Sequence, residues 1–130
     1  MAAVASLSFD QPGLHVLLER CDAIALDALP FGVIGFDAAA DVRRYNAAEV
    51  GGAGLAAQRV LGRPLFTEVA QCLNNYLVAQ RFDDAVEAGR ELDETVPFTF
   101  TLRMKPTPVF LRLLSSPEHA TQFIAILRRS

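Results

Sequence analysis

Residues 96–127 read VPFTFTLRMKPTPVFLRLLSSPEHATQFIAIL, and this stretch decides the fold. Its runs at 96–104, 109–114 and 122–127 are rich in Phe, Thr, Val, Leu and Ile, which is typical of β-strands. In the last run the apolar residues alternate between two faces, with Phe123, Ala125 and Leu127 on one and Ile124 and Ile126 on the other. A strand that is apolar on both faces is usually covered on both, so we expect packed layers on both sides of a sheet.

Two shorter apolar runs precede these strands and predict a hairpin. Residues 31–36 and 42–45 have the pattern of strands, and residues 37–41 join them as a turn. Helical patterns occupy residues 14–25 and much of 46–88. This order predicts an α+β fold with a five-stranded antiparallel sheet, helices on one face and an N-terminal helical cap on the other. The arrangement resembles that of a PAS sensor domain.

The chain has the length of one domain, which we divide into an N-terminal cap at residues 1–29 and a PAS core at residues 30–130. Residues 1–13 are expected to form a loose lead. After them, apolar residues recur at the spacing of one amphipathic helix: Leu14, Leu17, Leu18, Cys21, Ile24 and Ala25.

Several helices are expected between the two groups of strands. Asn46 is placed to cap a short helix at residues 47–50, and the glycine-rich residues 51–54 then break it as a flexible connector. A longer helix begins at Asn74 and ends at Gly89. Shorter helices are expected over residues 55–60 and 65–70.

Composition excludes several classes of protein. Lys and Arg number 12 against 15 Asp and Glu, and hydrophobic residues make up 52% of the chain. This balance excludes a disordered chain, and it lacks the basic excess that nucleic-acid binding needs. The longest nearly apolar stretch, residues 23–36, is too short to span a membrane. The first nine residues lack the features of a signal peptide, so we expect a cytoplasmic protein.

The few histidines and cysteines do not form a metal-binding pattern. His15 and His119 are the only histidines, and the chain has no Cys-x-x-Cys or His-x-x-x-His spacing. A zinc site needs three or four such ligands, so we expect no metal. Cys21 and Cys72 are too few for a disulfide scaffold, and both thiols are expected to be reduced.

Tyr45 and Glu49 are the first candidates for a site. They are four residues apart and could share one face of a short helix. In apolar surroundings the carboxyl group would stay protonated, and the two groups together could donate two hydrogen bonds to an anionic oxygen. The alternative is a surface glutamate next to a half-buried tyrosine.

Cys72 is the second candidate, because it precedes the helix expected from Asn74. Helix dipole and free N–H groups there would favour a thiolate, either as an attachment point or as a nucleophile. The alternative is a buried structural cysteine. No histidine lies near it in sequence, so a thiol enzyme is weakly supported. A third set of side chains would line a pocket or simply belong to the core: Phe66, Phe98, Phe100 and Met104.

Together these residues resemble the photoactive yellow protein family of bacterial light sensors. The segment Tyr45-Asn46-Ala47-Ala48-Glu49 matches the family's Tyr-Asn-Ala-Ala-Glu segment residue for residue. Residues 26–34 resemble the family's approach to its first strand, and residues 60–72 the stretch that ends at its chromophore-bearing cysteine. Residues 98–106 resemble the strand beside the chromophore. The resemblance runs from about residue 26 to residue 127.

The resemblance implies a blue-light photoreceptor that is not an enzyme. It places a 4-hydroxycinnamoyl (p-coumaroyl) chromophore, from 4-hydroxycinnamic acid, as a thioester on Cys72. The phenolate oxygen would be held by Tyr45 and by protonated Glu49. The other chromophore-binding residues would be Phe66, Phe100 and Met104. Light would isomerise the chromophore, Glu49 would give up its proton, and the N-terminal cap would rearrange because an unpaired buried charge is costly.

Three positions depart from the family pattern and favour an alternative. Ala53, Leu55 and Gln71 stand where well-studied members carry Thr, Arg and Pro. The alternative is a PAS module without a pigment that senses another small ligand or mediates protein–protein signalling. In either case the signal would pass to an unnamed downstream protein, with no nucleic acid or membrane as a partner, and the chain would be a monomer or a homodimer.

Overall fold

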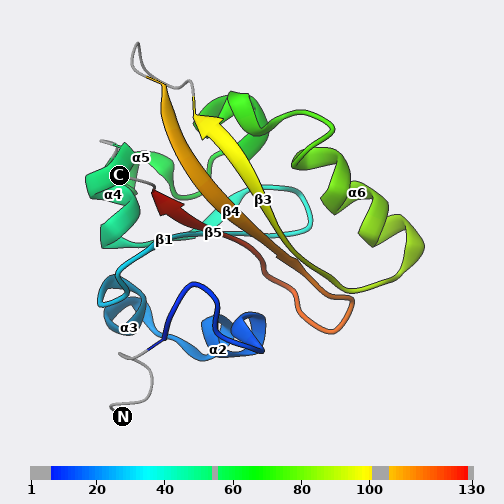
Figure 1. Ribbon diagram of the computed structural model, residues 1–130, viewed down its shortest axis with the longest axis horizontal. Helices are drawn as coiled ribbons and strands as arrows, with labels where there is room; N and C mark the ends of the chain where they lie inside the picture. The colour runs from blue at the N-terminus through cyan, green and yellow to red at the C-terminus, as the bar shows by residue number, and fades with distance from the viewer. Residues whose placement is uncertain (1–6, 54–55, 101–105, 129–130) are drawn as a thin grey trace.

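The computed structural model describes residues 7–53, 56–100 and 106–128. Its centre is one antiparallel sheet with the strand order β2-β1-β5-β4-β3 (Figure 1). The predicted five-stranded antiparallel sheet is therefore confirmed. The strands are β1 (Gly32–Phe36), β2 (Val42–Tyr45), β3 (Leu92–Phe100), β4 (Thr107–Ser115) and β5 (Gln122–Arg128).

Strand β3 begins earlier than its apolar run indicates. It starts at Leu92, which pairs with Ser115 at the far end of β4. Residues 93–95, which follow Leu92, are Asp, Glu and Thr, so they have no apolar strand pattern. The end of the predicted strand, residues 101–105, lies outside the described residues, and the predicted contact residue Met104 lies there as well.

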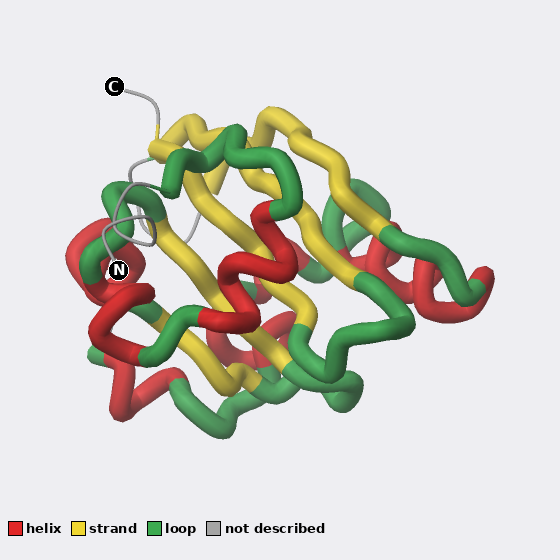
Figure 2. Tube along the Cα trace, turned by 90° about the horizontal axis from the view of Figure 1, so that it is seen from below, coloured by secondary structure: helices red, strands yellow, loops and turns green. Residues whose placement is uncertain are grey.

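Helices cover both faces of the sheet, and each face has its own core (Figure 2). Adjacent residues of β5 show the division. Ile124 and Ile126 belong to the core under the middle helices, which we call the main core. Phe123 and Ala125 belong to the core under the N-terminal helices, which we call the cap core. The layers on both faces are therefore confirmed, and so is the alternation of β5 over residues 123–126, whereas Leu127 is 38% exposed and belongs to neither core.

The cap contains two short helices instead of the single helix that the periodicity predicts. They are α2 (Leu14–Arg20) and α3 (Ala23–Asp27). The Asp22 side chain starts the second helix by accepting a hydrogen bond from the Ala25 backbone N–H at 2.8 Å. Because the helix axis changes at this point, Ile24 is 81% exposed and not buried as expected.

The segment just before α2 is fixed to the sheet. Leu7 and Phe9 are buried in the cap core. Arg112 of β4 donates from Nη1 to the main-chain oxygens of Phe9 and Gln11, at 2.8 Å in both cases. The prediction of a loose lead is wrong for residues 7–13, because an arginine far along the chain supplies the hydrogen bonds that an irregular segment lacks.

Helix α4 continues through glycines that were expected to break it. The helix spans Ala47–Ala53 and includes Gly51 and Gly52. The predicted connector at these positions is therefore wrong, and Gly52 has another role that is described below. The remaining helices on this face are α5 (Ala57–Val60), the wide turn η1 (Leu65–Val69), the short turn η2 (Gln71–Leu73) and α6 (Ala79–Ala88).

Helix α6 starts five residues later than predicted. The Asn75 side chain accepts hydrogen bonds from the backbone N–H groups of Leu77 and Val78, at 3.0 and 3.1 Å. These bonds hold the chain in a turn, so that Asn74 does not begin the helix. Gly89 ends α6 as expected. Among the helices of the described residues, none has the length and apolar character needed to cross a membrane.

Candidate functional site

Tyr45 and Glu49 lie next to each other, although only Glu49 is helical. Tyr45 is the last residue of β2, where it pairs with Ile34 of β1. Glu49 lies in the first turn of α4 and is 2% exposed. Burial raises the pKa of the Tyr45 hydroxyl, and the nearby charge of Glu49 raises it further. The expected proximity therefore arises from a strand end and a helix start, and not from one helix face.

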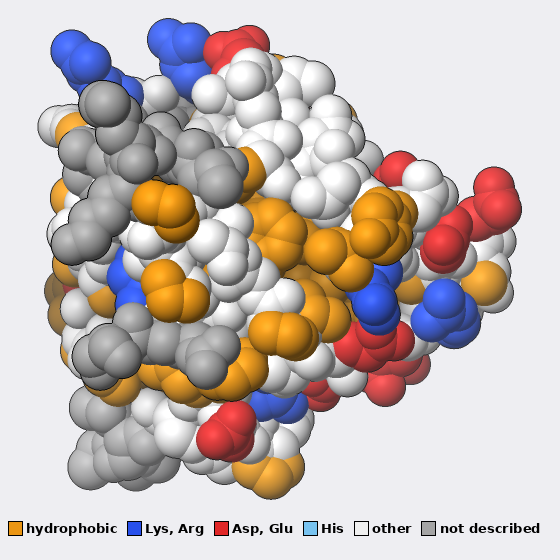
Figure 3. Space-filling model, turned by 45° about the horizontal axis from the view of Figure 1, so that its top comes forward, with side chains coloured by type: hydrophobic (Ala, Val, Ile, Leu, Met, Phe, Trp, Pro, Cys, Tyr) orange, Lys and Arg blue, Asp and Glu red, His pale blue; other side chains and the backbone are white. Residues whose placement is uncertain are grey.

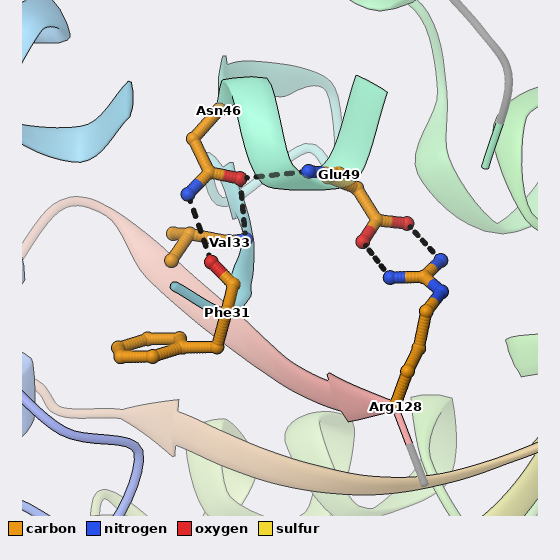
Figure 4. A network of polar contacts seen from close by, with 5 residues as sticks. All are labelled: Phe31, Val33, Asn46, Glu49 and Arg128. Atoms are coloured by element: carbon orange, nitrogen blue, oxygen red, sulfur yellow. Dashed lines mark hydrogen bonds and ion pairs between the residues drawn. The ribbon is translucent and has the colours of Figure 1, made fainter. Parts of the chain in front are cut away.

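Asn46 holds this junction together with four hydrogen bonds and is 1% exposed. Figure 4 draws its bonds to Val33, Glu49 and Phe31. Its Oδ1 accepts from the backbone N–H groups of Val33, at 2.9 Å, and of Glu49, at 3.2 Å. Its Nδ2 donates to the main-chain oxygens of Leu26 and Phe31, at 2.9 and 3.0 Å. The predicted cap at Asn46 is confirmed, and the same amide also joins the helix of Glu49 to the cap helix α3 and to β1.

The carboxyl group of Glu49 is paired with Arg128 at the end of β5 (Figure 4). Nη1 of Arg128 donates to Oε1 at 2.8 Å, and Nη2 donates to Oε2 at 3.1 Å. Burial raises the pKa of Glu49, whereas the hydrogen bonds and the positive charge of Arg128 oppose that rise. The sequence analysis did not identify Arg128, because its partner lies 79 positions earlier in the chain.

Two glycines leave the space in which this pair lies. A Cβ atom at Gly52 would overlap the guanidinium group of Arg128, and a Cβ atom at Gly32 would overlap Oε1 of Glu49. Neither overlap involves the backbone of the partner residue. The glycine-rich segment therefore allows an arginine side chain to lie against α4, and this explains why glycine is found inside a helix, where it lowers stability.

The predicted aromatic residues belong to the main core or pack against it. Phe100, at the end of β3, is buried, and the guanidinium carbon of Arg128 lies 5.6 Å from the centre of its ring. Phe66 is partly buried, and its ring packs edge-on against Phe36 at a centroid distance of 5.6 Å. The geometry thus joins Tyr45, Glu49, Arg128 and Phe100, and it places Phe66 on the same side of the sheet.

Cys72 lies in the short turn η2 and packs against the main core. It is partly buried and forms no disulfide. Since α6 begins only at Ala79, the predicted position of the thiol at the start of that helix is wrong, and the dipole of α6 is not placed to favour a thiolate at Cys72. What the structure supports is a thiol on the same face of the sheet as Tyr45 and Phe100.

The side chains around Tyr45 fit a phenolic ligand. Tyr45 carries a hydroxyl donor, and among the described residues no hydrogen bond uses it. A carboxyl group lies beside it, and Phe100 adds an aromatic ring. No group of three or more His, Cys, Asp or Glu side chains suited to a metal ion occurs in the part of the chain that the structure describes.

The molecular surface shows charge of both signs. On the face in Figure 3, hydrophobic side chains gather in the middle, and Lys, Arg, Asp and Glu side chains lie around them. The net charge of the chain is −3.

Comparison with known proteins found relatives of one name. A photoactive yellow protein from Halochromatium salexigens is 38% identical over 84 residues, which cover 65% of this chain and 66% of that protein. A photoactive yellow protein from Rhodothalassium salexigens is 29% identical over 103 residues, which cover 79% of this chain and 82% of that protein. No protein-family model matches the chain.

Solved structures show the same relationship at the level of the fold. The crystal structure of the photoactive yellow protein domain from the sensor histidine kinase Ppr of Rhodospirillum centenum matches with a TM-score of 0.77 and 34% identity. The match covers 86% of this chain and 96% of that domain. LOV and other PAS domains, including the RpfR receptor domain of Cronobacter turicensis in complex with BDSF, match at 14–16% identity with TM-scores of 0.54–0.59. The predicted PAS fold is therefore confirmed.

Proposed function

Because this chain belongs to the photoactive yellow protein family, we propose that it is a light sensor with a 4-hydroxycinnamoyl group bound as a thioester to Cys72. The observation that carries the proposal is the buried carboxyl group of Glu49 next to the hydroxyl group of Tyr45. Such a pair of polar groups at the edge of an apolar core provides a specific place for the ring oxygen of a phenolic ligand.

Each residue of the site has a separate task in this proposal. Tyr45 donates a hydrogen bond to the ring oxygen, and Glu49 is the second polar contact. Phe66 and Phe100 provide apolar contacts, and Met104, the third predicted contact residue, lies outside the described residues. The Cys72 thiol is the attachment point. When bound, the 4-hydroxycinnamoyl group supplies a double bond that isomerises on absorption of light.

The path by which a change at Glu49 is transmitted to the N-terminal cap passes through Asn46. This residue contacts the backbone of Glu49 on one side and the backbone of Leu26, in cap helix α3, on the other. The Ala47 N–H also donates to the Asp27 carboxylate of α3 at 2.8 Å. A change at Glu49 therefore reaches the cap over two direct contacts, and we propose that the cap presents the signal to a downstream protein.

Within the proposal, the chain acts by binding and rearrangement and not by catalysis. The kinase context belongs to the Rhodospirillum centenum protein, whose photoactive yellow protein domain is part of a sensor histidine kinase. For this chain we propose a separate or covalently linked signalling protein as the partner, in the cytoplasm, with the sensor as a monomer or homodimer.

A second candidate is a PAS module without a pigment. The ion pair between Glu49 and Arg128 favours it, because both carboxylate oxygens already have a partner. Ala53, Leu55 and Gln71 also differ from the family pattern. In this candidate, the same residues bind another small molecule with a hydroxyl group.

The test is to mix the purified protein with activated 4-hydroxycinnamic acid. The intact mass and the near-ultraviolet and visible spectrum are then recorded before and after irradiation at the new band. We expect one adduct and a band that bleaches and recovers. Cys72→Ser should abolish the adduct, and Cys21→Ser, which changes the buried thiol of the cap, should retain it. No adduct on the native chain, or one without a reversible band, would support the second candidate.

A further inference from the structure

The pairing of Glu49 with Arg128 has the geometry of an ionised carboxylate. Both oxygens of Glu49 accept a hydrogen bond, each from a different nitrogen of the same guanidinium group. A protonated carboxyl group has one hydroxyl that donates, and its hydroxyl oxygen is a weaker acceptor than a carboxylate oxygen, so acceptance at both oxygens favours the ionised form. Two parallel charge-assisted hydrogen bonds are also the strongest arrangement available to an arginine and a glutamate.

Three neighbours determine the position of the Arg128 guanidinium group. The Glu49 carboxylate lies in front of the guanidinium group, the Phe100 ring lies 5.6 Å from its carbon, and Gly52 leaves the space along α4. The Arg128 side chain is 26% exposed and that of Glu49 is 3% exposed. The positive charge therefore lies nearer the surface of the protein, and the negative charge is buried.

Few other charged groups face Glu49. Tyr45 approaches it from the end of β2, and Arg128 approaches from β5. Helix α3 packs against α4 and contributes Asp27, whose carboxylate is bound to the N–H of Ala47 at the exposed start of the helix. Strand β1, which also packs against α4, contains no titratable residue. Arg128 is thus the one positive partner of Glu49 among the described residues.

We propose that Arg128 is a specificity-determining residue, which keeps Glu49 ionised so that the site takes a ring hydroxyl group as a neutral donor and not as a phenolate. This inference rests on the proposed function, in which a phenolic group enters the site beside Tyr45. It departs from the expectation of a protonated Glu49.

The position of one proton shows why Arg128 determines whether the ligand is a neutral phenol or a phenolate. The ligand oxygen and Glu49 share a single proton, and the total charge with Arg128 is the same whichever of them carries it. With the proton on the ligand, Arg128 faces a carboxylate, and the ring hydroxyl group donates to an anion. With the proton on Glu49, both hydrogen bonds to Arg128 are weakened, and the phenolate is stabilised by Tyr45 and the neutral acid. The close bidentate pair therefore favours the neutral ligand.

The first measurement uses the protein without ligand. Glutamate is labelled with carbon-13 at its carboxyl carbon, and Glu49 is assigned by its loss in Glu49→Gln. We expect the Glu49 signal to be that of a carboxylate at neutral pH. In Arg128→Gln its titration midpoint should move to higher pH, because burial remains and the positive partner is lost. A neutral Glu49 in the native chain, or a midpoint that Arg128→Gln does not move, would overturn the inference.

Two glycines of α4 provide a matched pair of variants. Gly52→Ala places a Cβ atom where the guanidinium group lies, whereas a Cβ atom at Gly51 meets no atom within 4 Å. Both changes replace an exposed glycine by alanine in the same helix. We expect Gly52→Ala to move the Glu49 midpoint as Arg128→Gln does, and Gly51→Ala to leave it unchanged. Equal effects of the two glycine variants would contradict a specific role of Arg128.

The second measurement uses protein loaded with activated 4-hydroxycinnamic acid. We expect the native chain to absorb mainly in the near ultraviolet, as a neutral phenol does, and Arg128→Gln to gain a band at longer wavelength, as a phenolate does. Identical spectra would overturn the ligand part of the inference. Failure of every variant to form an adduct would instead overturn the proposed function, while the titration of Glu49 would still decide whether Arg128 keeps it ionised.

Discussion

Arg112 and Phe9 are 103 positions apart, and a hydrogen bond of 2.8 Å from the guanidinium group of Arg112 to the Phe9 main-chain oxygen joins them. Arg112 is also held by Asp93 of the neighbouring strand, with two hydrogen bonds of 2.8 and 2.9 Å. The segment before α2 is thus attached to the middle of β4, although it has no regular structure of its own.

Loss of this arginine should loosen that segment. Arg112→Met keeps the length of the side chain but leaves the oxygens of Phe9 and Gln11 without their donor, and we expect unfolding to require about 1–3 kcal/mol less free energy. Chemical denaturation measures the change, and limited proteolysis before residue 14 measures its location. Arg63→Met removes an exposed ion pair and should change stability by less than about 0.5 kcal/mol. Equal effects of the two variants would argue against the anchoring role.

Asn46 should be among the most sensitive polar residues. Asn46→Ala leaves two backbone N–H groups and two main-chain oxygens without their partner in a buried place, and it removes the cap of α4. We expect a loss of about 2–4 kcal/mol in unfolding free energy. Asn74→Ala changes an exposed asparagine and serves as the control. A loss below about 1 kcal/mol for Asn46→Ala would contradict the importance of the network.

His15 should make the stability of the protein depend on pH. Its Nε2 donates to the main-chain oxygen of Thr121 at 2.8 Å, and its ring lies 4.6 Å from that of His119. Burial lowers the pKa of His15, and the charge of His119 lowers it too, although the Thr121 oxygen and the carboxylates of Glu19 and Glu91 act in the opposite direction.

The sign of this effect follows from the lowered pKa. The folded protein binds the proton less readily than the unfolded chain, whose histidine has a pKa of 6.5. The contribution is fully present above that pH and is lost as the pH falls through it. Unfolding free energy should therefore decrease from pH 7.5 to 5.5, and the decrease should be smaller in His15→Gln. A slope that is the same in both proteins would show that His15 is not responsible.

Replacement of Glu49 should change the spectrum of the loaded protein. In Glu49→Gln no anion faces the ring oxygen, and Arg128 loses its partner and becomes available to a phenolate. We expect the absorption band to move to longer wavelength. Glu68→Gln changes a carboxylate that forms an exposed pair with Arg63, and it should leave the spectrum unchanged. An unmoved band in Glu49→Gln would remove Glu49 from the site.

The strands could be predicted from the sequence because their information is local. Alternation in β5 and the apolar runs of β1 and β2 are visible within a few residues, and the two-sided burial of β5 follows from them. The cap of α4 at Asn46 is equally local, since an asparagine caps an amide three residues further on. The resemblance to one family supplied the rest of the candidate site.

The failures occurred where a distant residue determines the local structure. Gly51 and Gly52 have the composition of a connector, but they are helical, and the partner that explains Gly52 is Arg128 at the end of the last strand. The ion pair itself joins residues that no periodicity relates. A charged residue at a strand end is usually a solvated one, so Arg128 gave no signal in the sequence.

A second kind of wrong prediction arose from side chains that compete with the backbone for hydrogen bonds. Asp22 divides the predicted cap helix, and Asn75 delays the start of α6 by binding the N–H groups of Leu77 and Val78. Short polar side chains of this kind favour turns over helix interiors, and the apolar periodicity around them conceals the effect.

The two-sided burial of β5 also restricts how the molecule can move. If β5 slipped by one position along its neighbours, Phe123 would turn into the main core and Ile124 into the cap core. All remaining side chains of the strand would also move to the opposite face. The aromatic ring and the branched chain differ in shape, so both cores would have to be repacked at once. A signal is therefore not transmitted by sliding of β5, the central strand. The sheet acts as a fixed partition, and any response has to travel by detachment of the elements that rest on it.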